Sequence, residues 1–198
     1  LQQYHFQPVV SNAAYLLARS YADEAATYNP QQHKANDSLN PRYLYQKAAA
    51  LCRQVLQQDV LTEGKVNCQL LLRQIEQKEI SITGEAVVVP EQPFRILLSY
   101  RNMPQVWIRI IAAPATWKDA SQDTSFWQLL INAQPLATTN FSLPAADDHQ
   151  PHKTELPLPS LKAGRYVILA SATPNFERTN NLLAAFYTHC SNIAWMQQ

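Results

Sequence analysis

The segment Leu156-Pro-Leu-Pro-Ser-Leu-Lys-Ala-Gly-Arg-Tyr-Val-Ile-Leu-Ala-Ser171 decides how the second half of this chain folds. Pro157 and Pro159 keep its first part extended and remove two backbone donors, which suits either the edge of a sheet or the end of a strand. Lys162–Gly164 supplies a turn. Tyr166–Ala170 is then a nearly continuous apolar run of strand length, as expected of a strand covered on both faces. These features predict two strands of a β-sandwich.

Working outward from this segment, apolar and polar side chains alternate with a period of two from Glu79 onwards. Residues 93–112 show the alternation on both sides of the turn-forming sequence Asn102-Met-Pro-Gln105, which predicts a hairpin. Further strands are expected at 80–82, 86–89, 135–143, 152–158, 164–171 and 182–193, with one or two helical turns at 125–131. Short strands in this number are typical of a sandwich.

The first part of the chain has helical periodicity instead. Ser11 is a candidate N-cap for a first helix, with Pro8 ending any earlier one. Asn40-Pro41 combines an N-cap with proline at the first helical position, where its missing N–H costs nothing. Helices are expected at about residues 11–28, 41–58 and 64–78. The second and third should pack antiparallel as a helical hairpin, like one unit of an α-solenoid.

The change of period at Glu79 predicts a domain boundary. We therefore expect a helical segment over residues 1–78 and an antiparallel β-sandwich over residues 79–198. The predicted fold class is α+β.

Composition and charge exclude several classes of function. The chain has 16 Lys and Arg against 15 Asp and Glu, a formal net charge of +1, which gives no field for nucleic acid or an anionic membrane surface. No apolar run approaches the roughly 20 residues that span a bilayer. Only 3 Gly accompany 13 Pro, which argues against a glycine-built phosphate cradle. The chain begins at Leu1, and we expect it to be a piece of a longer protein.

Few side chains are candidates for chemistry. The metal-type ligands gather in Asp147-Asp148-His149-Gln150-Pro151-His152. A metal site needs three or four converging donors held by a second shell, and this stretch is a proline-containing loop, so we interpret it as a solvated loop and not as a metal site. His189 and Cys190 are adjacent on a predicted strand, so their side chains point to opposite faces and cannot form a nucleophile–base pair. We therefore predict no catalytic, cofactor-binding or metal-binding residue, no cofactor, and a protein that is not an enzyme.

Cysteine and tryptophan leave two alternatives open. Cys52 and Cys68 fall on successive predicted helices, either as two small buried residues or, in an oxidising compartment, as a bridge. The four tryptophans lie either in the core and its rim or on a platform for sugar or peptide. They are Trp107, Trp117, Trp127 and Trp195.

Three stretches carry a resemblance to a known family. They are Ile80-Ser-Ile-Thr-Gly-Glu with Pro90-Glu-Gln-Pro-Phe-Arg-Ile-Leu-Leu-Ser-Tyr-Arg-Asn102, then Leu156–Ser171, then Phe186–Ile193. Together they resemble an early macroglobulin-type domain of the large bacterial alpha-2-macroglobulin family, in the form typical of Bacteroides-like bacteria. The helices, with Ala50-Leu-Cys52 and Asn67-Cys68, are similar to the segment before the first sandwich there. The resemblance covers about residues 41–195.

The resemblance implies an exported protein of the periplasm or cell envelope that entraps attacking proteases. It implies a non-catalytic N-terminal scaffold whose partners are other domains of the same chain, with proteases bound through the full-length protein. The thioester motif Cys-Gly-Glu-Gln of many members is absent, and no bait segment is identifiable. No functional residue of the family is therefore carried onto this chain. The alternative hypothesis is a free-standing carbohydrate- or peptide-binding surface module.

Overall fold

A computed structural model describes residues 8–33, 40–113, 124–144 and 146–192. The chain divides into two compact units. The first, here called the helical unit, comprises Leu1–Gln77 and Ala146–Gln150, and the second, the β unit, comprises Lys78–Ala145 and Pro151–Gln198. Helices come first in the chain and two β-sheets follow, so the predicted α+β class is confirmed.

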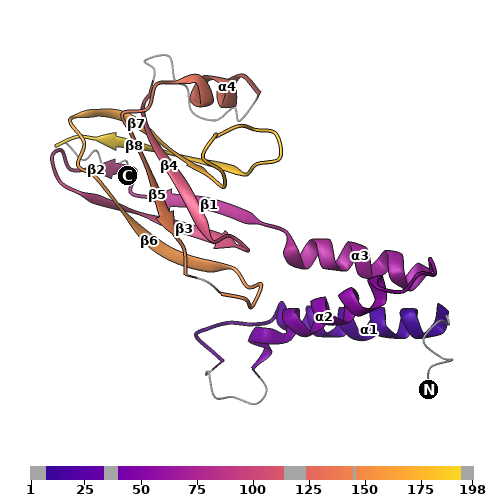
Figure 1. The fold of residues 1–198 in the computed structure, drawn as a ribbon. Coiled ribbons are helices and arrows are strands. Elements are labelled where there is room, and N and C mark those ends of the chain that lie inside the picture. The colour runs from indigo at the N-terminus through magenta and orange to yellow at the C-terminus, as the bar shows by residue number, and fades with distance from the viewer. Residues whose placement is uncertain (1–7, 34–39, 114–123, 145, 193–198) are drawn as a thin grey trace. The chain divides into compact units, whose positions relative to one another are not determined.

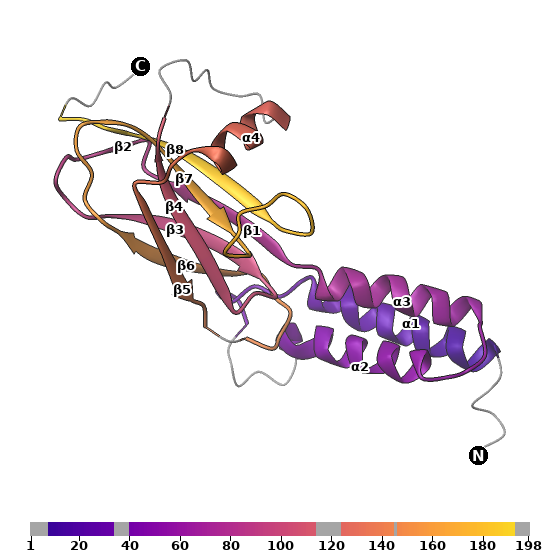
Figure 2. The ribbon, with the colours of Figure 1, turned by 45° about the horizontal axis from the view of Figure 1, so that its top comes forward.

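The described residues of the helical unit form three α-helices and one short 3₁₀ turn. They are α1 (Pro8–Ala25), η2 (Pro41–Tyr43), α2 (Leu44–Leu56) and α3 (Glu63–Glu76). The three α-helices lie side by side in both ribbon views (Figures 1 and 2). Their common core is made mostly of small residues, which lets the helix axes approach closely. The buried members are Ala18, Ala22, Ala48, Ala49, Cys52, Val55, Cys68, Leu71 and Ile75.

The start signal at Asn40-Pro41 is confirmed. The Oδ1 atom of Asn40 accepts a hydrogen bond from the backbone N–H of Arg42 at 2.9 Å, and Pro41 is the first residue of the turn that leads into α2. Thr62 caps α3 in the same way, since its Oγ1 accepts from the backbone N–H of Lys65 at 3.1 Å.

The predicted N-cap role of Ser11 is wrong. Helix α1 already begins at Pro8, a residue well suited to a first helical turn because it has no N–H to leave unpaired. Ser11 lies inside the helix, where its hydroxyl bonds back to the carbonyl oxygen of Pro8 at 2.9 Å. The same hydroxyl is 2.8 Å from Oγ1 of Thr62, so a buried polar contact joins the first turn of α1 to the N-terminus of α3.

Gly64 stands at this junction because the two backbones nearly touch. A Cβ atom added to Gly64 would lie 2.4 Å from the backbone carbon of Ser11 and 2.5 Å from the backbone nitrogen of Asn12. Only glycine fits such an approach.

The β unit contains two sheets. The three-stranded sheet has the order β1-β3-β6, and the five-stranded sheet has the order β2-β8-β7-β4-β5. Neighbouring strands are antiparallel except β2 and β8, which run parallel. The elements are β1 (Glu79–Gly84), β2 (Val87–Val88), β3 (Phe94–Arg101), β4 (Gln105–Ala112), α4 (Thr124–Asn132), β5 (Ala137–Ser142), β6 (His152–Leu158), β7 (Gly164–Ser171) and β8 (Leu183–Cys190).

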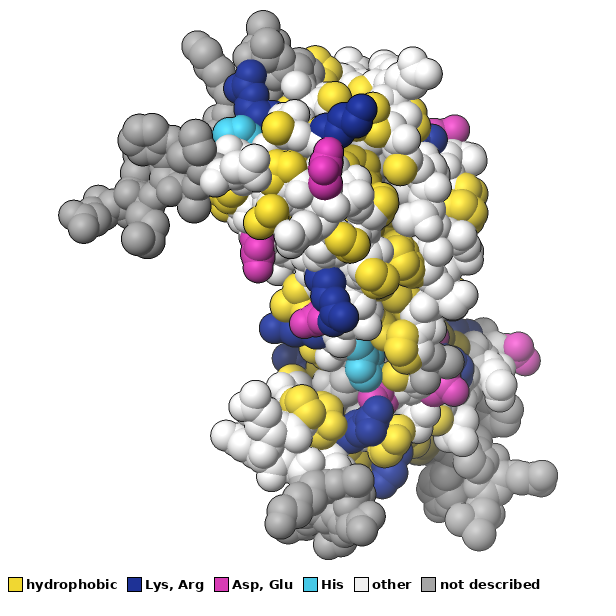
Figure 3. Space-filling model, turned by 90° about the vertical axis from the view of Figure 1, so that its left-hand side faces the viewer, with side chains coloured by type: hydrophobic (Ala, Val, Ile, Leu, Met, Phe, Trp, Pro, Cys, Tyr) yellow, Lys and Arg dark blue, Asp and Glu magenta, His cyan; other side chains and the backbone are white. Residues whose placement is uncertain are grey.

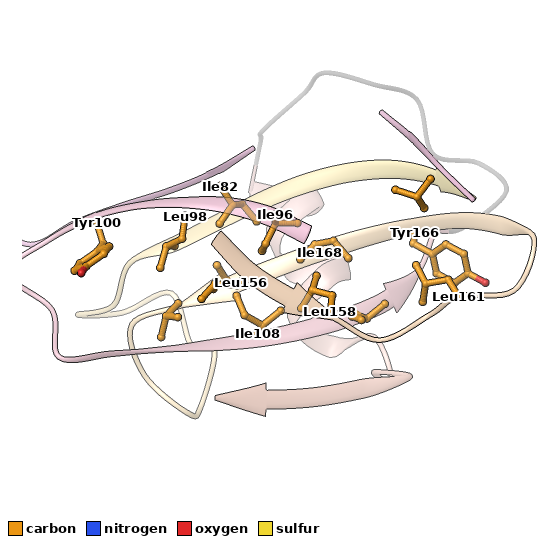
Figure 4. Close-up of a cluster of buried hydrophobic side chains, with 14 of the residues drawn as sticks. Ile82, Ile96, Leu98, Tyr100, Ile108, Leu156, Leu158, Leu161, Tyr166 and Ile168 are labelled. Carbon is orange, nitrogen blue, oxygen red and sulfur yellow. The ribbon is translucent and has the colours of Figure 1, made fainter. Parts of the chain in front are cut away.

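The main core lies between the two sheets. Figure 4 shows side chains of β1, β3 and β6 meeting those of β4 and β7, with Ile96 and Leu98 opposite Ile108 and Ile168. The predicted alternation along β3 is confirmed, because Ile96, Leu98 and Tyr100 are buried. This interdigitated layer of large aliphatic residues is the main apolar burial that holds the sheets together.

The decisive segment is placed as predicted. Strand β6, which carries Pro157, is an edge of the three-stranded sheet, while β7 is the central strand of the five-stranded sheet. Tyr166, Ile168 and Ala170 face the main core. Val167 and Leu169 face a second core, which α4 and the loop after β7 supply with Leu130 and Phe176. Strand β7 is therefore covered on both faces.

The predicted hairpin over residues 93–112 does not form. Strand β3 pairs with β1 and β6, and β4 pairs with β5 and β7, so the turn between them crosses from one sheet to the other. The crossing has a physical reason. Met103 turns into the main core with 6% of its surface exposed, while Asn102 adopts a left-handed conformation with φ of 55°. The apolar faces of β3 and β4 therefore meet across the core instead of lying side by side.

Replacing Gly64 tests the close approach of α1 and α3. Gly64→Ala should lower the free energy of unfolding by about 2 kcal/mol, because its Cβ would push two backbones apart. Gly164→Ala is the matched control, since its Cβ would meet only the end of the Tyr166 side chain at 3.2 Å. Urea unfolding followed by circular dichroism measures both. A Gly64→Ala protein more stable than the wild type, as helix propensity alone predicts, would contradict the packing described.

Candidate functional site

A hollow of about 510 Å³ opens on the β unit where the chain passes from β1 through β2 to β3. Its lining combines Val88 at the end of β2 and Val89 just after it with the first half of β3 and one residue of β6. We call it the β2–β3 groove. Its lining residues are Gly84, Glu85, Val88, Val89, Gln92, Pro93, Phe94, Arg95, Ile96, Leu97 and Glu155.

Hydrogen bonds to two other parts of the β unit fix the wall of the groove, residues 85–93. On the side of β8, the Thr188 hydroxyl donates to the carbonyl oxygen of Glu85 at 2.9 Å. The backbone N–H of Ser191, the residue after β8, donates to the carbonyl oxygen of Val88 at 3.0 Å. At the far end, the backbone N–H of Glu91 donates to the carbonyl oxygen of Leu161 at 2.8 Å. Since these bonds tie the wall to the sheet, the groove exists before any partner binds, which reduces the ordering cost of binding.

The lining of the groove includes exposed apolar side chains beside exposed charged ones. Leu97 and Val89 keep 38% and 51% of their surface exposed. Beside them, Arg95 Nη1 lies 2.6 Å from Glu155 Oε2 across two neighbouring strands. Both charged side chains are well exposed, so their mutual attraction is weak and each remains available to a partner. An apolar centre beside a polar, charged rim is the usual composition of an interface.

Three side chains of the groove lining are ionisable. Its ionisable side chains are the carboxylates of Glu85 and Glu155 and the guanidinium of Arg95. The described residues of the lining include no histidine or cysteine. Sequence reasoning missed this groove because its parts come from β1, β3 and β6, which only the sheet order brings together. The paired prolines of Pro90-Glu-Gln-Pro93 were the one local sign of a rigid wall.

The predicted solvated loop at Asp147–His152 is wrong for its centre. Asp148 is fully buried and Gln150 is 4% exposed. Asp148 Oδ2 accepts a hydrogen bond from Arg42 Nε at 2.8 Å, and its Oδ1 accepts one from the Gln150 backbone at 3.0 Å. The Gln150 amide donates to the carbonyl oxygen of Ala25, at the end of α1, at 2.9 Å. These residues belong to the helical unit and bind its helices. The Asp148 carboxylate accepts hydrogen bonds both from the Arg42 guanidinium and from the turn at Gln150.

Within the described ranges, no group of three or more His, Cys, Asp and Glu side chains is arranged to hold a metal ion. The described helices likewise include none that is long and apolar enough to cross a membrane. Figure 3 shows one face of the molecule, on which side chains of both charges are scattered among apolar and uncharged ones. This face has no single-sign field of the kind that attracts polyanions.

The three thiols are all free and buried. As predicted, His189 and Cys190 point to opposite faces of β8, with His189 exposed and Cys190 in the main core. Burial and the neighbouring Cys68 thiol raise the pKa of Cys52 to about 12, and burial raises the pKa of Cys68 and of Cys190. All three are therefore protonated and poor nucleophiles in the folded protein.

Two of the four tryptophans lie among the described residues. Trp107 and Trp127 are half-buried and pack against the second core of the β unit, beside Leu130 and Phe176. Neither forms an exposed platform for a sugar. Trp117 and Trp195 lie outside the described residues.

Comparisons with known proteins give little further guidance. No protein-family model and no curated protein matches the sequence. The chain is similar to a crystal structure, in complex with di-metal ions, of the CARDB domain of the PF1109 protein from Pyrococcus furiosus. The identity is 14% and the TM-score 0.33, over 58% of this chain and 92% of that one. A solution structure of the same domain gives 14% and 0.31, over 57% and 93%. Likeness at this level carries no inference about function.

Removing the buried carboxylate tests the closure of the helical unit. Asp148→Ala should lower the free energy of unfolding by about 3 kcal/mol, because it leaves Arg42 and the Gln150 turn without their acceptor. Asp23→Ala is the control, since its ion pair with Arg19 is exposed and contributes at most about 0.5 kcal/mol. Urea denaturation measures both variants. Equal decreases in the free energy of unfolding of the two variants would show that the Arg42–Asp148 pair stabilises the protein no more than an exposed ion pair does.

Alkaline pH tests the burial of the Cys52 thiol. Its pKa is about 12 in the folded state against an ordinary value of 9.0, so its contribution to stability is complete below pH 9 and is lost between pH 9 and 12. At pH 10 under reducing conditions, the wild type should have lost about 1 kcal/mol more than Cys52→Ala, relative to pH 7.5. Parallel urea titrations at the two pH values give this difference. Identical pH dependence in both proteins would mean that the thiol ionises freely when folded.

Proposed function

We propose that this chain is a non-catalytic scaffold region of a larger alpha-2-macroglobulin-like, protease-trapping protein, and that it acts by packing against other domains of that protein. The observation that carries the scaffold role is the β2–β3 groove, a preformed hollow with apolar side chains and an exposed ion pair. The family assignment rests on the sequence resemblance. Its segments fall on β1 and β3, on the β6–β7 region and on β8.

The groove suits a segment of a neighbouring domain. Val89 and Leu97 offer an apolar centre, and Arg95 and Glu155 offer one charge of each sign at the rim. An extended segment with one large apolar side chain and flanking polar groups complements such a surface. A covalent tether between the two domains raises the effective concentration of the segment, so a modest contact suffices.

The wider setting follows from the same resemblance. The parent protein would be exported to the periplasm or cell envelope, and proteases would be partners of the full-length protein only. In that setting the β unit serves as a rigid body whose neighbours rearrange after proteolytic cleavage. The protonated, buried thiols support a non-catalytic role, because none of them is available for covalent capture.

A peptide-binding module is the second candidate, and the same groove favours it. Its rigid wall and exposed Leu97 would equally fit a peptide from another protein. Carbohydrate binding has weaker support, because Trp107 and Trp127 pack against the second core. The two candidates differ in whether the occupant of the groove belongs to the same chain.

Mutating the groove within the parent protein separates the two functions. Leu97→Asp should weaken domain packing in the scaffold, and so should loosen the intact parent or abolish its change of shape after limited proteolysis. Small-angle scattering and native electrophoresis, before and after cleavage, measure this effect. Leu136→Asp is the control, because Leu136 is 61% exposed outside the groove.

Either of two results would contradict the scaffold proposal. One is a parent protein whose shape does not respond to proteolysis. The other is a Leu97→Asp parent that behaves like the Leu136→Asp control. In the second case, a peptide-array screen that finds ligands for the wild-type chain but not for Leu97→Asp would favour the binding module.

A further inference from the structure

Two cysteines of the helical unit stand in contact across neighbouring helices. Cys52 lies on α2 and Cys68 on α3, and the short connection at 57–62 makes these helices antiparallel neighbours. Both side chains are fully buried in the same core cluster. The Cys68 thiol also contributes to the raised pKa of Cys52, so it lies in the immediate surroundings of that side chain. Ala48 and Ala49 are also fully buried in this cluster, and such small side chains keep α2 close to its neighbours.

We propose that Cys52 and Cys68 form a disulfide that links α2 to α3 when the chain folds in an oxidising compartment. The oxidant is a disulfide, either a small one such as oxidised glutathione or that of a protein oxidoreductase. A thiolate of one cysteine attacks it and forms a mixed disulfide, which releases one thiol. The second cysteine then displaces the other thiol. The two cysteines lose two protons and two electrons, and the oxidant leaves as two thiols.

Contact between the thiols is the geometric requirement that few cysteine pairs meet. A disulfide needs Cα atoms within about 7 Å and Cβ atoms that point toward each other. Two buried side chains that belong to one core cluster, on packed neighbouring helices, are positioned for such a geometry. The disulfide would place a bond between two sulfur atoms that are already buried in the same core cluster, so the surrounding core needs little rearrangement.

Burial determines when this reaction happens. In the folded protein neither sulfur is accessible, and the Cys52 thiol resists ionisation, so an oxidant finds no thiolate to react with. The bridge therefore forms during folding, while the helical hairpin is still open. Once formed, it is equally out of reach of reductants. The chain thus has two stable forms, one reduced and one with the disulfide, and the compartment in which it folds determines which form is made.

The third cysteine provides an internal control. Cys190 lies in the main core of the β unit, and its Sγ faces the carbonyl oxygen of Leu161 at 3.5 Å. Cys52 and Cys68 belong to the core of the other unit. The proposal therefore predicts one specific pairing and one thiol that stays free.

Oxidative refolding of the chain tests the proposal. The protein is unfolded in urea and refolded either in a glutathione redox buffer or with excess dithiothreitol. The oxidised product should be lighter by about 2 Da, with one free thiol, and peptide mapping should join Cys52 to Cys68. Its melting temperature should exceed that of the reduced form by at least about 5 °C, because the bridge restricts the unfolded chain.

Variants decide the assignment. Cys190→Ala should keep both the mass loss and the gain in melting temperature, whereas Cys52→Ala and Cys68→Ala should abolish both. Cys52→Ser and Cys68→Ser serve as second variants if an alanine protein fails to fold. Three free thiols after oxidative refolding, a bridge that includes Cys190, or an oxidised form that melts below the reduced one would each overturn the proposal.

Discussion

Coverage of both faces of β7 is the constraint on which the β unit depends. A strand with five consecutive apolar residues, such as Tyr166–Ala170 of β7, cannot lie on a surface, so its sheet needs a layer on each side. The three-stranded sheet covers one face, and α4 with the loop that carries Phe176 covers the other. Much of the architecture follows from this requirement, including the chain crossing at Met103 and the position of Arg109, which stacks 4.0 Å above the Phe176 ring.

Local sequence signals predicted most elements of the fold, because each rests on a local cause. Asn40-Pro41 starts a helix whatever lies around it, and the run Tyr166–Ala170 demands burial on both faces. The errors have causes that are not local. Alternating faces at 93–112 suit a hairpin and a sheet crossing equally well. The polar sequence at 147–150 cannot show that Asp148 pairs with Arg42, which is far away in the chain.

The candidate site lay beyond sequence reasoning for the same reason. The groove is a property of sheet order, since Glu155 reaches Arg95 only because β6 pairs with β3. The contact between Cys52 and Cys68, in contrast, was within reach, because two helices joined by a short connection must be antiparallel. Function is therefore best approached here through surfaces and pairings, and less through motifs, of which the chain has few.

The five residues Ala146–Gln150 give the chain an unusual order of assembly. They belong to the helical unit, yet they are separated from its helices by β1 to β5. During synthesis, the last residues of the helical unit therefore leave the ribosome only after much of the β unit has been made. Until then, the carbonyl oxygen of Ala25 lacks its amide and Arg42 lacks its carboxylate. The helical unit is thus discontinuous along the chain, and a gene fragment that ends after α3 would encode the helices without residues 146–150 of the same unit.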